Sequence, residues 1–587
     1  MNTYMSHSGG SNKNILLTSV FGPFAQDDEY GSRTINPMEL FHNQVTREQG
    51  PFSLRMFHPS FGLLMIMENI SAPCTLLDFP DLERFIEEIT TKKYDIIGIS
   101  SIIPNVGKVK KMCEIIREHQ PGATIVVGGH VANIRDLGSR VDADHIVRGE
   151  GIRWFRRFLG EDENAPVKHP AVKSAMDARI VGMTLRDKPG DVAGILIPSV
   201  GCPMGCNFCA TSHLFGGKGK SVNFYETGDE LYTVLCDLET KLGVRSFFVL
   251  DENFMLNRKR ALRLLELMKI NAKSWSFNIF SSARVIQSYN DEDLIRLGVS
   301  WIWMGLEGQG SQYTKLDGID TKALVKHLQS LGIRVLGSTI IGLENHTPEN
   351  MDDAIDWAVD HATVFHQFML YTPLPGTPLH AEHARAGTLL SEEECPIADT
   401  HGQHRFNFRH PFIRNQDETE FLRRAFVRDF QVNGPSLLRL IRSMLMGWQR
   451  LKNHPDPCVR DRAKWEFEPI TTTYAAAVRA MKIWYRHDEA MYREVVGLLK
   501  GLYSEFGIRT RMIAGLLGPL LYLAMRREEK RLNAGWTREP EARYEKNAAA
   551  LALESGESLA ATLTKKAARV KESLAVSPRP EIETPLP

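Results

Sequence analysis

The sequence predicts an α/β protein with two consecutive runs of alternating strands and helices, followed by an α-helical C-terminal region. Short apolar runs bounded by Gly or Pro alternate with amphipathic stretches up to about residue 385. An irregular connector at 151–192 separates the two runs, and beyond residue 386 apolar residues recur at helical spacing. Strand–helix alternation is typical of parallel sheets covered by helices.

Composition and charge are those of an ordinary globular chain. The 587 residues suffice for several domains, and Lys+Arg equals Asp+Glu at 71 each, so no net charge attracts nucleic acid. The N-terminus is polar and lacks the apolar core of a signal peptide, and no uninterrupted apolar run reaches membrane-spanning length. We therefore expect a cytoplasmic protein without a nucleic-acid partner.

Residues 1–150 are predicted to form a Rossmann-like open parallel sheet. Strands are expected at 15–20, 94–100, 123–127 and 145–147, and helices at 81–91 and 106–119. Phe21–Pro80 is expected to hold short helices. Ligands of such sheets bind beyond the carboxyl ends of the strands. The candidate binding residues at these ends are Ser100, Asn105, Gly128, Gly129, His130, Gly149 and Glu150. No G-x-G-x-x-G follows the first strand, so a dinucleotide is not indicated.

Residues 193–385 contain six predicted strand–helix units. The strands are expected at 195–200, 245–251, 275–282, 299–306, 333–341 and 364–371. Six units are fewer than the eight that close a complete barrel, so we predict a partial (β/α)6 TIM-type barrel. Chemistry in such barrels gathers at the carboxyl ends of the strands.

The first of these strands runs into a loop that carries Cys202, Cys206 and Cys209 in C-x3-C-x2-C spacing. Three thiolates within eight residues favour one compact metal centre, and a [4Fe–4S] cluster is normally held by cysteines. Three protein ligands leave one iron open for a substrate or cofactor. The alternatives are a structural zinc with His213 as its fourth ligand, a disulfide that leaves an odd thiol, or inert cysteines.

This spacing, with Phe208 just before the last cysteine, resembles the signature loop of radical S-adenosylmethionine (SAM) enzymes. The resemblance implies that SAM chelates the open iron and that an electron from the cluster cleaves it to a 5′-deoxyadenosyl radical. A donor such as flavodoxin or ferredoxin would supply the electron, and Phe208 would lie near the adenine. Further SAM-contacting candidates at the strand ends are Glu252, Asn253, Ser282, Arg284 and Glu307. The motif after the second strand departs from the common Gly-Gly-Glu form, and helix capping is the alternative role for Asp251 and Glu252.

The segments D-I-I-G-I-S-S, V-V-G-G-H and A-D-H-I-V-R-G-E-G resemble the cobalamin-binding domain that precedes many radical SAM modules. The resemblance implies cobalamin at the strand ends of residues 1–150. The D-x-H-x-x-G motif is absent, so the chain would supply no such histidine ligand to cobalt. The alternative is a sheet domain without its cofactor, in which the paired glycines only form a turn.

Residues 386–545 are predicted to form a helical C-terminal domain, and residues 546–587 a partly disordered tail. Ser436 is expected to cap one of the helices. Within this domain, Met512–Met525 is apolar and lies between basic flanks. Either it is a buried core helix, or it makes a peripheral contact with the membrane interface.

Taken together, the motifs favour a cobalamin-dependent radical SAM enzyme that methylates an unactivated carbon of a small molecule. The apolar C-terminal helices point to a lipid substrate such as a hopanoid. One alternative is a radical SAM oxidoreductase or cyclase without methyl transfer. The alternative from another class is a non-catalytic metal-binding scaffold.

Overall fold

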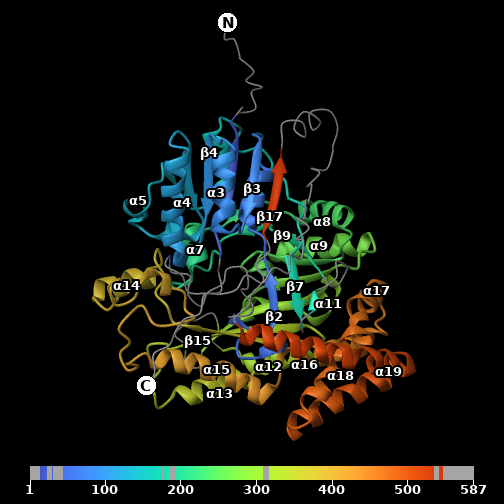
Figure 1. The fold of residues 1–587 in the computed structure, drawn as a ribbon. Helices are drawn as coiled ribbons and strands as arrows, with labels where there is room; N and C mark the ends of the chain where they lie inside the picture. Colours follow the sequence, from blue (N-terminus) through green and yellow to red (C-terminus); the bar gives the residue numbers. More distant parts are fainter. Residues whose placement is uncertain are drawn as a thin grey trace.

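The computed structural model describes residues 13–22, 30, 44–174, 176–180, 183–184, 192–308, 316, 318–534 and 541–546. Figure 1 shows the N-terminal sheet in blue above a green barrel, with orange and red C-terminal helices around the opposite end of the barrel. The predicted 546–587 tail lies outside the described residues beyond Lys546, as does part of the predicted Phe21–Pro80 segment.

The N-terminal sheet has the order β17-β3-β1-β4-β5-β6, and all of its strands are parallel except β17. The strands are β1 (Ile15–Ser19), β3 (Cys74–Asp78), β4 (Ile96–Ser100), β5 (Thr124–Gly128), β6 (His145–Ile146) and β17 (Ala542–Lys546). The helices are α2 (Phe61–Glu68), α3 (Leu82–Thr91), α4 (Val106–His119), α5 (Leu137–Arg140) and α6 (Gly151–Phe158). The predicted Rossmann-like open sheet is confirmed. Its order reverses at β1, which places a ligand crevice beyond the carboxyl ends of β1 and β4.

Two strands of this sheet were not predicted. β3 lies within the segment expected to hold short helices, where its five residues C-T-L-L-D are too few to show a periodicity. β17 comes from the predicted helical C-terminal domain and pairs antiparallel with β3. Its sequence A-R-Y-E-K is polar and shows no apolar strand pattern. The polar side chains have partners in the fold: Arg543 pairs with Glu88, and Lys546 Nζ donates to the carbonyl of Ile70 at 3.0 Å.

The predicted connector 151–192 is also partly structured. Its first residues form α6, whose Phe155 is buried in the core of the N-terminal sheet. Further along, β7 (Met176–Ile180) and β8 (Met183–Thr184) join β2 (Leu54–Phe57) in a three-stranded antiparallel sheet. The N-terminal domain therefore extends beyond residue 150.

The second sheet has the order β16-β15-β14-β13-β12-β9, and all of its pairings are parallel. The strands are β9 (Gly194–Leu196), β12 (Ser246–Val249), β13 (Ser276–Phe280), β14 (Val299–Glu307), β15 (Arg334–Ile341) and β16 (Phe365–Leu370). The helices are α8 (Gly228–Leu242), α9 (Arg258–Ile270), α10 (Ala283–Gln287), α11 (Asp291–Leu297), α12 (Thr321–Ser330), α13 (Met351–Val359) and α14 (Pro378–Ala386). The predicted six-stranded partial barrel is therefore confirmed.

The predicted strand 195–200 is divided. Its second part, β10 (Ser199–Val200), leaves the barrel and pairs antiparallel with β11 (Val222–Asn223). This short ribbon closes the base of the loop that carries the three cysteines and the short helix α7 (Ala210–Leu214).

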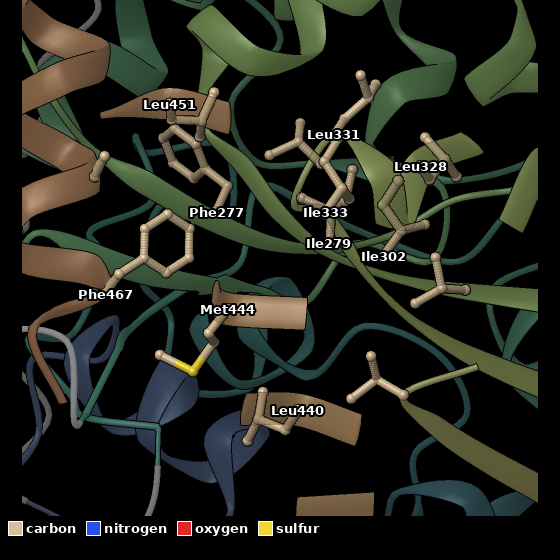
Figure 2. Packing of buried hydrophobic residues seen from close by; sticks show 14 of the residues in the cluster. Phe277, Ile279, Ile302, Leu328, Leu331, Ile333, Leu440, Met444, Leu451 and Phe467 are labelled. Carbon is tan, nitrogen blue, oxygen red and sulfur yellow. The ribbon is translucent and has the colours of Figure 1, made fainter. Parts of the chain in front are cut away.

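C-terminal helices cover the amino ends of the barrel strands. They are α15 (Asp417–Asn433), α16 (Ser436–Leu451), α17 (Pro457–Glu466), α18 (Thr473–Trp484) and α19 (Glu489–Asn533). Figure 2 shows Leu440 and Met444 of α16 beside barrel residues such as Phe277 and Ile279. The predicted cap is wrong, because Pro435 is the N-cap of α16 and the Ser436 hydroxyl instead accepts hydrogen bonds from Gln49 and Arg439.

Candidate functional site

The three cysteines lie on one turn between β10 and α7. Cys209 caps α7, because its sulfur accepts a hydrogen bond from the Ser212 N–H at 3.4 Å. The Ser212 hydroxyl donates to the carbonyl of Cys202 at 2.6 Å and closes the loop. Gly205 has a φ of +62°, and a Cβ there would lie 2.4 Å from Lys218 Cα, so the turn requires glycine.

The cysteine side chains form one group. All three are free and half-buried. Burial, together with the neighbouring Cys206 and Cys209, raises the pKa of Cys202 to about 11. In the described part of the chain, no three His, Cys, Asp or Glu side chains are placed to hold a single metal ion. The ring of His213 instead contacts the carbonyl of Cys206 at 3.2 Å. His213 is therefore engaged with the loop backbone, and three cysteines on one loop are the ligand type that a [4Fe–4S] cluster uses.

Asp251 and Glu252 follow β12 but have different surroundings. The Asp251 carboxylate accepts from the Ser199 hydroxyl at 2.6 Å and from Arg260 Nη2 at 2.5 Å, so it forms a buried ion pair. Glu252 accepts a backbone hydrogen bond from Gly201, and its Oε2 is buried with no partner among the described residues. Burial raises the pKa of Glu252 to about 7. An unpaired acceptor beside the cysteine loop fits the cationic ammonium of SAM.

The polar ends of the next strands are connected to this rim. The Ser281 hydroxyl donates to Asn253 Oδ1 at 3.0 Å, and the Ser282 N–H donates to the same oxygen at 3.2 Å. At the end of β14, Glu307 is 4% exposed and has a φ of +60°. Non-glycine residues rarely adopt this conformation, and such strain is common at functional sites.

Phe208 and Arg284 are the two other predicted SAM contacts. Phe208 packs against the apolar cluster that contains Ile341 and Leu343, on the far side of the barrel from β12. Arg284 is exposed on α10 and is not among the residues lining the described cavities. A role for Arg284 in binding SAM stays a prediction.

The strand ends of the N-terminal sheet face the barrel across a cavity of about 410 Å³. Four of the predicted residues line it, namely Ser100, Asn105, Gly129 and His130. Gly129 has a φ of +84°, and a Cβ there would lie 2.6 Å from the carbonyl of Ser101, so only glycine fits. From the barrel, the cavity is lined by Phe248, Leu250, Phe280 and Trp303. A cavity of this size between two domains fits part of a large cofactor such as cobalamin.

The remaining predicted residues flank this edge. Gly128 ends β5 in register with Ser100, and Gly149 has a φ of +99°. Glu150 is a helix cap, because its carboxylate accepts from the backbone N–H groups of Ile152 and Arg153 at the start of α6.

Two hydrogen bonds join the N-terminal strand ends to the cysteine loop. His130 Nε2 lies 3.0 Å from the Thr211 hydroxyl, and Asn133 Nδ2 donates to the carbonyl of Ala210 at 3.3 Å. Thr211 and Ala210 both belong to α7. The two candidate sites predicted from separate parts of the sequence therefore lie next to each other.

Several residues of this site were not predicted. Ser19, His58 and Phe79 line the same cavity as Gly129. Ser19 is the last residue of β1, a strand that was predicted without its end being named as a candidate, whereas Phe79 follows β3, which was not predicted. His58 lies in a loop and carries no sequence signal for its position.

Comparisons with known proteins agree with this arrangement. The B12 binding domain family matches residues 53–159, and the Radical SAM superfamily matches residues 196–358. An uncharacterized methyltransferase of Pyrococcus horikoshii is 27% identical over 354 residues, which are 54% of this chain and 74% of that protein. The bacteriochlorophyllide d C-8(2)-methyltransferase of Chlorobaculum tepidum is 24% identical over 362 residues, 58% of this chain and 78% of that protein.

A more distant relative is the hopanoid C-2 methylase of Rhodopseudomonas palustris, which is 27% identical over 207 residues, 33% of this chain and 38% of that protein. Among solved structures, the radical SAM methyltransferase TsrM of Kitasatospora setae, with cobalamin and a [4Fe–4S] cluster bound, has a TM-score of 0.47 and 13% identity. The match covers 78% of this chain and 99% of that one. The chain therefore carries a B12 binding domain followed by a radical SAM domain, and this pair of domains implies a [4Fe–4S] cluster, SAM and cobalamin as cofactors.

Proposed function

We propose that the chain transfers a methyl group to an unactivated carbon of an apolar small molecule. The observation that carries this proposal is the contact between η3 (His130–Asn133) of the N-terminal domain and α7 of the cysteine loop. It holds the cobalamin side and the SAM side of the site next to one cavity. The similar proteins named above are also methyltransferases.

Each group at the site then has a role. Cys202, Cys206 and Cys209 hold the cluster, and the free carboxylate oxygen of Glu252 accepts from the SAM ammonium. Asn253, Ser282 and Glu307 bind the ribose and the amino-acid part of SAM. When bound, the cluster and SAM supply a hydrogen-abstracting radical, and cobalamin supplies the methyl group. Flavodoxin or ferredoxin is the proposed electron donor.

The cobalamin edge is formed by backbone and small polar side chains. Ser100, Asn105 and Gly129 contact the corrin side of the cavity, and His130 keeps its ring on Thr211. A Cβ at Gly129 would collide with Ser101, so glycine there lets the ends of β4 and β5 pack closely at this edge of the cavity.

The aromatic lining of the barrel side favours an apolar substrate. Phe248 stacks on Phe280 with ring centroids 5.7 Å apart, and Phe280 stacks on Trp303 at 4.9 Å. Such a surface binds a hydrocarbon better than a charged metabolite. A lipid, with a hopanoid as one example, is the proposed substrate class.

Helix α19 supports contact with a lipid surface. By length and composition alone, Glu489–Asn533 is long and apolar enough to cross a membrane. Only 28% of its most apolar window is buried against the rest of the described protein. One face, with Ala514, Leu521 and Met525, packs into the core. The opposite face leaves large apolar side chains exposed, namely Ile508, Met512, Leu516, Leu520 and Leu523.

The buried-helix alternative therefore describes only half of the α19 surface. Exposed arginines flank the apolar face at both ends, at 509, 511, 526 and 527. Apolar residues between basic flanks suit an anionic membrane surface. We assign this face to peripheral contact with the inner face of the membrane.

Methyl transfer is tested on protein purified anaerobically and loaded with cobalamin. With dithionite, methyl-labelled SAM and a cellular lipid extract, we expect 5′-deoxyadenosine and label in the lipid fraction. Cys206→Ala should lose the cluster iron and both products, whereas the matched Cys236→Ala, outside the motif, should keep them. Formation of 5′-deoxyadenosine without label in lipid or in any other acceptor would favour the oxidoreductase or cyclase alternative. Absence of both would favour the scaffold.

Membrane contact is tested by flotation with vesicles that contain phosphatidylglycerol. The wild-type protein should float, and a Leu516→Glu/Leu520→Glu variant should remain in the dense fraction. Ile270→Glu is the matched control, because Ile270 is an equally exposed apolar residue on α9. If the Leu516→Glu/Leu520→Glu variant floats as well as the wild type, the assignment is contradicted.

A further inference from the structure

A second cavity, of about 220 Å³, lies at the opposite end of the barrel. Residues at the amino ends of β12, β13, β14 and β15 line one side of it, namely Ser246, Ser276, Ser300 and Arg334. The α16 residues Leu437, Leu440 and Met444 line the other side. We call this space the lower chamber, and the 410 Å³ cavity at the N-terminal sheet the upper chamber.

The two chambers meet inside the barrel. Phe248 and Trp303 line both of them. These rings and Phe280 form the stacked row described above, which crosses the barrel between the chambers. Only this layer of side chains separates the lower chamber from the strand ends that face the cysteine loop and the N-terminal sheet.

The lower chamber contains charge, but the charge is paired. Arg334 forms an ion pair with Glu466 of α17, and both side chains are less than a tenth exposed. Arg334 Nε also donates to the carbonyl of Ser300 at 3.0 Å. The Ser276 hydroxyl donates to the Ser300 hydroxyl at 2.7 Å. Because these groups satisfy one another, the chamber offers no free charge to an ionic ligand.

The walls are aromatic and aliphatic. Trp301 stacks on Phe365 with centroids 5.3 Å apart, and Trp465 and Tyr474 line the same space. An apolar cavity of about 150 Å³ is already large enough to bind benzene. The lower chamber therefore holds a ring or a short chain, but a complete lipid needs both chambers.

We infer that the lower chamber binds the apolar end of the substrate, whose reacting end lies in the upper chamber. The substrate class is an elongated, uncharged hydrocarbon that passes Trp303 and Phe248 along the barrel. The α16 and α17 helices then form the far wall of the substrate site and limit substrate length. This inference rests on the proposed function, since it takes the upper chamber as the place of reaction.

The test uses the cobalamin-loaded full chain and the rod-shaped neutral probe diphenylhexatriene. Energy transfer from the tryptophans reports bound probe, and the Met444 variants show how much of it is bound in the lower chamber. Met444→Phe fills the chamber and should weaken probe affinity at least about tenfold, because overpacked cavities exclude ligand. Met446→Phe is the matched control, since Met446 is 41% exposed on the same helix, and its affinity should stay within about twofold of wild type.

A second variant keeps the test decisive if Met444→Phe does not fold. Met444→Ala enlarges the chamber and should raise probe affinity about threefold or more. The inference is overturned if the wild type binds no probe, or if both Met444 variants bind like the wild type. Probe binding requires no chemistry, so chamber-dependent binding without any methyl transfer would contradict the proposed function alone. Methyl transfer that Met444→Phe leaves unchanged would contradict the chamber alone.

Discussion

Asp251 and Glu252 are neighbours in sequence with separate tasks at the rim of the barrel. Asp251 pairs with Arg260 and binds Ser199, so it ties the strand before the cysteine loop to α9. Glu252 is held in place by the backbone of Gly201 and keeps one oxygen free beside the thiols. A buried ion pair thus lies next to the carboxylate that we propose binds SAM.

The Asp251 pair can be compared with a surface pair on the same helix. Removing one partner of a buried pair leaves an uncompensated charge, so Asp251→Asn should lower the free energy of unfolding by about 3–5 kcal/mol. The matched Asp229→Asn breaks the exposed Asp229–Arg263 pair and should leave stability close to wild type. Urea unfolding measures both variants, and equal losses would show that Asp251 is not a structural anchor.

At the scale of elements, β17 completes the N-terminal sheet from the far end of the chain. It covers β3, which without it would be an edge strand with unpaired backbone groups. Arg543 also contributes to the charge around Glu88, which is 1% exposed and pairs with Arg84 and Lys92 as well. Domains predicted as separate are therefore joined by a strand.

Truncation after Ala534 should destabilise the protein, because it removes β17 and leaves the Glu88 cluster without Arg543. We expect a lower unfolding temperature and concentration-dependent self-association through the exposed β3 edge. Truncation after Lys546 is the control, and it should behave as wild type because the sequence predicts a Pro- and Ser-rich tail there. Thermal unfolding and light scattering distinguish the two, and identical behaviour would contradict a role for β17.

At the scale of the whole molecule, buried histidines with lowered pKa values occur in the 151–192 segment, in the barrel and in the C-terminal segment. Burial lowers the pKa of His169 to about 4, of His346 to about 4, and of His366 and His401 to about 3. Both ring nitrogens of His366 have partners, Thr339 at 2.9 Å and Thr363 at 3.2 Å, so the neutral ring is part of the packing.

Stability should therefore fall on acidification. In the unfolded chain these rings bind a proton near pH 6.5, while the folded protein resists protonation until about pH 4 or 3. Their stabilising contribution is complete above pH 6.5 and declines as the pH falls, by about 1.4 kcal/mol per pH unit for each ring. Urea unfolding between pH 7.5 and pH 5 measures the slope, which His366→Asn should reduce. Stability independent of pH over this range would contradict the prediction.

The strand–helix alternation and the cysteine spacing were sufficient to predict both parallel sheets and the loop that holds the thiols. These signals are local, because a buried parallel strand is a short apolar run and a three-ligand loop is contiguous in sequence. Arg284 was predicted by residue type at a strand end and lies exposed in α10, so its part in the site stays a prediction. Glu150 was chosen because it follows a predicted strand. In the structure it caps α6, because it directly precedes that helix.

The sequence by itself determined the fold class and, through short motifs that resemble known families, the two cofactor-binding modules; it also predicted the cluster ligands. Each of these depends on a pattern within a few dozen residues. Only the tertiary structure decided that β17 returns to β3, that α7 meets His130, and that two chambers share Phe248 and Trp303. These contacts join segments tens to hundreds of residues apart. They depend on how sheets and helices pack against each other, which no local pattern of residues specifies.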